Sequence, residues 1–74
     1  GDAEVAETLL KLGADPNFKN YNGATALIFA ASFGHVEVVK VLLAHRADKS
    51  IADLSGKTAL QHAGNNETLV GLLS

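Results

Sequence analysis

Three histidines are the residues of this chain best suited to metal binding or acid–base chemistry: His35, His45 and His62. A zinc site needs several ligands that converge in space, and the sequence holds no Cys to add thiolates to the imidazoles. His45, expected to be exposed at a helix end, could approach His62 between neighbouring structural units. The sequence places no Asp or Glu to join them. We therefore expect no metal site and no cofactor.

Hydroxyl and carboxyl groups offer equally little for catalysis. The serines, at positions 32, 50, 55 and 74, show no nucleophile elbow and no histidine partner in the sequence. Asp15 and Asp48 are expected to be separate turn residues, not a catalytic pair. Gly23 and Gly56 also suit turns, and the chain has no glycine-rich phosphate loop. The sequence therefore predicts that this chain is not an enzyme.

Size and composition narrow the class of protein further. The 74 residues leave room for one small domain. Six Lys and Arg are dispersed among eight Asp and Glu, for a formal net charge of −2, so the basic stripe of a nucleic-acid binder is missing. The sequence shows neither a membrane-spanning apolar run nor a secretory signal. We expect no nucleic-acid or membrane partner, and an intracellular location is favoured.

A 33-residue repeat organises the chain. When the sequence is compared with itself at that offset, twelve of the 41 residue pairs are identical, and they keep one register as far as residue 63. An ordinary helical bundle has no reason to repeat its turns and caps at a fixed period. We therefore divide the single domain into a partial repeat (1–19), a complete repeat (20–52) and a shortened terminal repeat (53–74).

Each repeat is expected to begin with a turn and a helix cap. The turns are predicted at residues 20–23 and 53–56, where an Asx residue comes first and Gly last. Thr25 and Thr58 follow as N-caps, because a side-chain hydroxyl can accept a hydrogen bond from an unpaired backbone N–H. Thr58 also fits a capping box with Gln61, three residues later, whereas Thr25 with Ile28 in the complete repeat does not.

Two short helices should follow each turn. In the complete repeat they are predicted over residues 26–33 and 36–44, with Gly34 between them. Apolar stripes run along the second helices: Val5, Leu9 and Leu12 in the first unit; Val38, Val41 and Leu42 in the next; Leu69, Val70, Leu72 and Leu73 in the last. Stacked helix pairs can bury such stripes, which a single pair cannot. The first stripe lacks a neighbour, so self-association through it stays open.

This combination of features resembles the ankyrin repeats. The matching segments are Gly23-x-Thr25-Ala26-Leu27, Ala30-Ala31, Gly34-His35, Val38-Val39, Leu42-Leu43 and Ala47-Asp48. The resemblance covers essentially the whole chain. It implies an all-α solenoid of helix-turn-helix repeats with short β-turn or hairpin tips, and a structural role for His35 at the start of a second helix.

The chain departs from the family pattern at several positions. The Pro after the capping Thr is missing, and the His that ties turn to helix is replaced by Ile28 and Gln61. Arg46 replaces a helix-ending Gly and should cost about 1 kcal/mol in a left-handed conformation. The last unit aligns best with two residues missing near Asn65, and Gly71 should weaken its second helix.

The chain is expected to be a piece of a longer ankyrin array. The resemblance implies that it binds a partner protein through a concave face of turn tips and first-helix surfaces. Carried over by position, that face comprises Lys19, Tyr21, Asn22, Ala24, Ser32 and Phe33 in one step, and Ala52, Leu54, Ser55, Lys57, Asn65 and Asn66 in the next. Tyr21, Phe33 and Leu54 are the expected anchors. Phe33 could instead pack between repeats, and Leu54 could fill a gap in a loop. The alternative function is a structural spacer, or a packing or self-association segment, of a larger protein.

Overall fold

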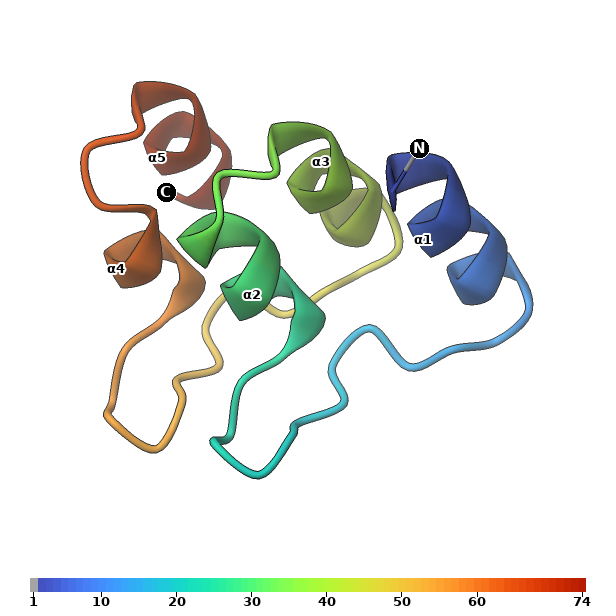
Figure 1. Cartoon of the computed structure of the whole chain (residues 1–74), viewed down its shortest axis with the longest axis horizontal. Helices are drawn as coiled ribbons and strands as arrows, with labels where there is room; N and C mark the ends of the chain where they lie inside the picture. The colour runs from blue at the N-terminus through green and yellow to red at the C-terminus, as the bar shows by residue number, and fades with distance from the viewer. Residues whose placement is uncertain (1) are drawn as a thin grey trace.

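A computed structural model describes residues 2–74 (Figure 1). Its helices are α1 (Asp2–Lys11), α2 (Ala26–Ser32), α3 (Val36–Ala44), α4 (Ala59–Ala63) and α5 (Glu67–Leu73). Over these described residues there is no strand, only an isolated antiparallel bridge between Ala52 and Thr58. The predicted all-α repeat architecture is confirmed. Gly1, which opens the predicted partial repeat, lies outside the described residues.

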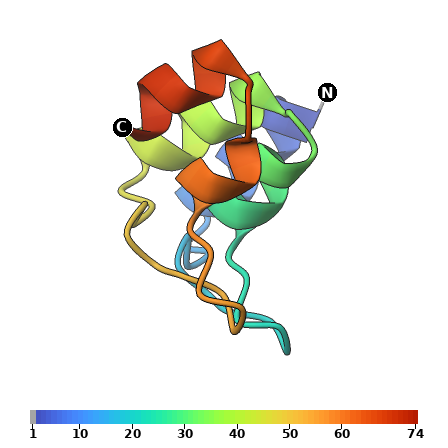
Figure 2. The same cartoon turned by 90° about the vertical axis from the view of Figure 1, so that its left-hand side faces the viewer.

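The helices form two layers from which the turns project. α1, α3 and α5 lie side by side in an outer layer, and α2 and α4 lie in a second layer (Figure 2). α2 packs against α3 and α4, while α3 packs against both α1 and α5. Each helix therefore finds much of its packing on a neighbouring unit, as expected of a solenoid. Over residues 2–74, no helix is long and apolar enough to cross a bilayer.

Local hydrogen bonds explain where α2 and α4, the helices of the second layer, begin. The Thr25 hydroxyl accepts a hydrogen bond from the backbone N–H of Ile28 (3.3 Å), which caps α2. At α4 the predicted capping box is present in full: Gln61 N–H donates to the Thr58 hydroxyl, and the Gln61 side chain accepts from Thr58 N–H. The observed α2 ends at Ser32, one residue before the predicted limit.

The outer-layer helices also begin and end largely as predicted. α3 spans the predicted residues and ends before Arg46, whose φ of 70° is the left-handed conformation expected there. α5 is capped by Asn66, whose Oδ1 accepts from Leu69 N–H. Asn66 follows the α3 N-cap residue, His35, by 31 positions instead of 33. The offset between these two N-caps is therefore two residues shorter than the 33-residue period.

The core lies between the two layers. Its buried apolar residues are Leu27, Ile28, Ala30, Ala31, Val39, Leu42, Ala59, Ala63, Leu69 and Leu73. The predicted stripe of α3 was wrong in part: Val39 and Leu42 are buried, while Val38 and Val41 are half-buried. The reason is that α3 has helices on both flanks, so its burial does not follow one stripe. By contrast, α1 buries no residue completely.

Candidate partner-binding face

Asn20 holds the first turn tip in shape. Its Oδ1 accepts hydrogen bonds from the backbone N–H groups of Asn22 (2.9 Å) and Ala24 (3.0 Å). Its backbone carbonyl accepts from Gly23 N–H. These bonds close an Asx turn at the predicted position and leave the side chain of Tyr21 fully exposed, at 102% of its reference area.

Asp53 builds the second tip in the same way. Its Oδ1 accepts from the backbone N–H groups of Ser55 (2.9 Å) and Lys57 (3.0 Å). Its second oxygen, Oδ2, lies 2.7 Å from His62 Nε2. The hydrogen bond from His62 is the main cause of the lowered pKa of the Asp53 carboxyl, and the backbone N–H of Lys57 contributes in the same direction. Leu54, at the tip, is 81% exposed.

The two tips are joined directly through the main chain. Leu54 N–H donates to the carbonyl oxygen of Asn22 at 2.9 Å. Gly23, with φ of +73°, allows this close approach: a Cβ at that position would lie 3.1 Å from the Leu54 nitrogen and 3.3 Å from Leu54 Cγ. The predicted glycine therefore meets two requirements at once, a left-handed backbone and room for the neighbouring tip.

An aromatic row extends from α2 towards the start of α3. The rings of Phe29 and Phe33 are stacked with centroids 6.3 Å apart and planes within 5°, and the His35 ring lies 6.2 Å beyond Phe33. Phe33 is 69% exposed. The side chain of His35, for which a structural role was implied, is exposed and makes no capping hydrogen bond. Sequence reasoning overlooked Phe29, although its four-residue spacing from Phe33 signals a shared helix face.

Most of the predicted binding residues are accessible. The exposed ones are Lys19, Tyr21, Asn22, Ser32, Phe33, Leu54, Ser55, Lys57 and Asn65. Three are half-buried and have structural tasks: Ala24 donates to Asn20, Ala52 forms the bridge to Thr58, and Asn66 caps α5. Together these twelve residues are called the turn-tip face below.

Two of the three histidines, His45 and His62, have carboxylate partners that the sequence did not indicate. Besides the pair of His62 with Asp53, His45 Nε2 lies 3.5 Å from Glu7 Oε1. His45 is half-buried, not exposed as expected. The two pairs are separate. Over residues 2–74, no three His, Cys, Asp or Glu side chains gather as they would around a metal ion.

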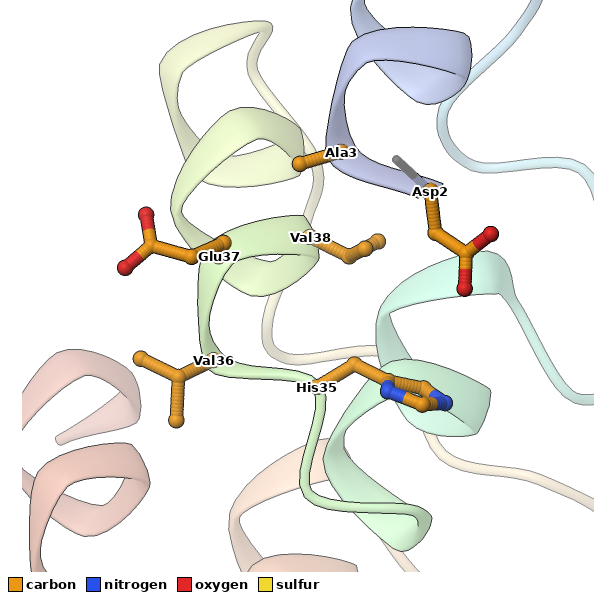
Figure 3. Close-up of a pocket in the computed structure, with 6 residues that line it drawn as sticks. All are labelled: Asp2, Ala3, His35, Val36, Glu37 and Val38. Carbon is orange, nitrogen blue, oxygen red and sulfur yellow. The ribbon is translucent and has the colours of Figure 1, made fainter.

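A shallow pocket lies between the start of α1 and the start of α3. It is lined by Asp2, Ala3, His35, Val36, Glu37 and Val38 (Figure 3). Figure 3 shows the Glu37 carboxylate pointing away from Asp2 and from the His35 ring. Glu37 therefore does not face Asp2 or His35 across this hollow.

Comparison with known proteins places the chain among repeat proteins. Residues 1–74 match the family described as "Ankyrin repeats (3 copies)". The chain is 48% identical over 67 residues to E3 ubiquitin-protein ligase XBAT33 of Arabidopsis thaliana and 46% identical over 67 residues to "Probable E3 ubiquitin-protein ligase XBOS33" of Oryza sativa subsp. japonica. These alignments cover 89% of this chain but only 13% of each relative.

The name of a third relative states a different activity. The ADP-ribosylation factor GTPase-activating protein AGD4 of Arabidopsis thaliana is 40% identical over 63 residues, which is 85% of this chain and 8% of that protein. The matched segment therefore occurs in proteins with different named activities and forms a small part of each.

Proposed function

Because the chain belongs to the ankyrin repeat family, whose members are generally protein-interaction modules, we propose that it binds a partner protein through its turn-tip face. Residues 1–19, 20–52 and 53–74 are the proposed repeat units. Recognition here is rigid-surface binding without a cofactor, a metal ion or a chemical step. The activities named for the relatives belong to proteins of which this chain is a small part, and we do not assign them to residues 1–74.

The exposure of the three expected anchors is the observation that carries this proposal. Tyr21, Leu54 and Phe33 are large side chains that the fold leaves uncovered. Such groups are efficient anchors, since burying an aromatic or aliphatic side chain against a partner removes apolar area from water. The alternative roles were packing between repeats for Phe33 and filling a loop gap for Leu54. Exposures of 69% for Phe33 and 81% for Leu54 fit these roles poorly.

The hydrogen bonds of the tips add to the argument. Asn20 and Asp53 fix the turns from within, and the bond between Leu54 and Asn22 fixes one tip against the other. A surface that is already ordered loses little conformational entropy when it binds. This favours recognition by a preformed surface over folding on binding.

A photocrosslinking experiment tests the proposal in the full-length protein that contains this chain. The photoreactive residue p-benzoylphenylalanine replaces Tyr21 in one variant and Lys40, on the outer layer, in a control. We expect a discrete protein adduct from position 21 and none from position 40. The affinity of the captured partner should then fall about tenfold or more for Tyr21→Ala and Leu54→Ser at unchanged stability. Undiminished affinity in both variants would refute the turn-tip face.

A second candidate function rests on α1. Val5, Leu9 and Leu12 are exposed, and α1 completely buries none of its residues. An apolar helix face of this kind suits packing within a larger protein, or association with a second copy of the chain. Sedimentation velocity over a concentration series distinguishes these roles: a monomer at all concentrations excludes self-association.

A further inference from the structure

The turn-tip face carries charge of one sign only. Among its twelve residues, Lys19 and Lys57 are charged, and both are exposed. In the described part of the chain, neither ammonium group has an ion-pair partner, in contrast to Lys11 and Lys40 on the outer layer, which pair with glutamates. Two unpaired cations are therefore available to a partner.

Asp53, the carboxylate next to Leu54 in the second tip, is already occupied. The side chain of Asp53 is only 12% exposed. Its Oδ2 is held by His62, and its Oδ1 accepts two backbone hydrogen bonds of its own turn. Its charge is therefore directed into the repeat, and it presents no acidic group on the face.

The negative charge of the chain lies outside the turn-tip face. Because the face carries two positive charges and the whole chain a formal net charge of −2, the other residues together carry −4. The outer helices hold two lysines, Lys11 and Lys40, against five carboxylates, whereas α2 and α4 hold no Asp, Glu, Lys or Arg. The five carboxylates are Asp2, Glu4, Glu7, Glu37 and Glu67. An approaching ligand thus meets a positive face opposite a negative one, and such asymmetry orients charged partners during association.

Each step of the face also combines a cation with an apolar group. Lys19 accompanies Tyr21 in the first step, and Lys57 accompanies Leu54 in the second. Packed helices such as α2 and α4 lie about 8–10 Å apart, and an extended peptide advances about 3.3 Å per residue. One repeat step therefore corresponds to about three residues of an extended ligand.

We propose that the turn-tip face binds an extended acidic peptide segment of its partner. The segment carries two acidic residues about three positions apart, each beside an apolar residue. The carboxylates meet Lys19 and Lys57, and the apolar side chains pack against Tyr21 and Leu54. This inference rests on the proposed function, because it specifies the ligand of the same face.

Peptide selection from an unbiased pool tests the proposed chemistry. A phage-displayed library of random peptides is panned at low ionic strength against the whole chain, against Lys19→Glu/Lys57→Glu, and against Lys11→Glu/Lys40→Glu. The last variant undergoes the same change in net charge on the outer layer. Circular dichroism confirms that all three proteins are folded. The wild type and the outer-layer variant should enrich acidic peptides with the predicted spacing, and the tip variant should bind them about tenfold more weakly.

Each outcome separates the peptide proposal from the binding face. Enrichment of neutral or basic peptides by the wild type, equal binding by the tip variant, or no enrichment at all overturns the acidic ligand. Selected peptides are then measured against Tyr21→Ala and Leu54→Ser. If they bind both variants as strongly as the wild type, the turn-tip face itself is wrong. If they lose binding there but are not acidic, the face stands and only its charge preference fails.

Discussion

His62 Nε2 lies 2.7 Å from Asp53 Oδ2, and this contact ties the second turn tip to the helix behind it. Thirty-three residues earlier the equivalent positions are Phe29 and Asn20, so the first tip has no counterpart. The family's histidine tie is absent from both repeats at its usual position. In the last repeat, His62 follows that position by one residue and supplies a substitute.

The tie makes part of the stability of the chain depend on pH. Hydrogen bonding to His62 lowers the pKa of the Asp53 carboxyl in the folded state. The ionised carboxylate therefore stabilises the fold fully at pH values above its unfolded pKa of about 4. This stabilisation is lost as the pH falls through the pKa that Asp53 has in the folded state. Asp53→Asn keeps an oxygen for the turn, as Asn20 does, but removes the titration. Melting temperatures from pH 7 to pH 2 should therefore fall less steeply for Asp53→Asn than for the wild type. Asp48, whose pKa is also lowered, titrates in both proteins. Parallel curves would contradict the prediction.

Gly71 weakens the last helix without serving a packing need. It lies inside α5, is exposed, and a Cβ built on it meets nothing within 4 Å. Gly71→Ala should therefore raise the free energy of unfolding by about 0.5–1 kcal/mol. Urea unfolding followed by circular dichroism measures the change. A destabilised variant would show that α5 does not persist as a regular helix.

A comparison of Gly23→Ala with Gly56→Ala separates two costs in stability. One cost comes from a left-handed backbone at a residue with a Cβ, and the other from crowding the contact between the two tips. Both have positive φ, at +73° and +78°, but only Gly23 has a neighbour that a Cβ would meet, the main chain of Leu54. Gly56→Ala should destabilise the chain by about 1–2 kcal/mol, and Gly23→Ala should cost more. The comparison uses the same unfolding assay. Equal losses would mean that the two tips are not in contact in solution.

At Arg46, by contrast, a glycine should stabilise the chain. It is the non-glycine residue with positive φ in the described chain, at 70°, and it is exposed. Arg46→Gly should stabilise the chain by about 0.5–1 kcal/mol, because glycine adopts this conformation without a Cβ penalty. Lys40→Gly, in the middle of α3, is the control and should destabilise by about 1 kcal/mol. A loss of stability in Arg46→Gly would assign its side chain a structural task.

Features that depend on near neighbours in the chain were predictable from the sequence. The capping box of Thr58 and Gln61 and the left-handed Arg46 involve residues within one turn of a helix, where residue type largely determines conformation. The 33-residue repeat places the same turn and helix pair in successive units, and this predicts the stacked helical architecture. The same alignment predicted a last unit that is two residues shorter, and the N-caps of α3 and α5 are 31 residues apart.

Features that depend on contacts between separate elements of the fold were not predictable. Val39 is completely buried while Val38 is not, because α3 has a helix on each side and helical spacing alone cannot say which residues become covered. The pair of His62 and Asp53 spans nine residues and forms only when the turn folds back on α4. The spacing of Phe29 from Phe33 indicates that both rings share one face of α2, but it does not say whether that face is exposed.

The bond between Leu54 N–H and the Asn22 carbonyl has a consequence for how such a protein can diverge. Only main-chain atoms take part in it, so it does not depend on which side chains positions 22 and 54 carry. Provided that Gly23 is kept, mutation can replace the groups that a partner contacts while the spacing between tips stays constant. Side-chain atoms thus determine which ligand is bound, and main-chain atoms hold the two tips together. Selection can therefore change ligand specificity without destabilising the scaffold.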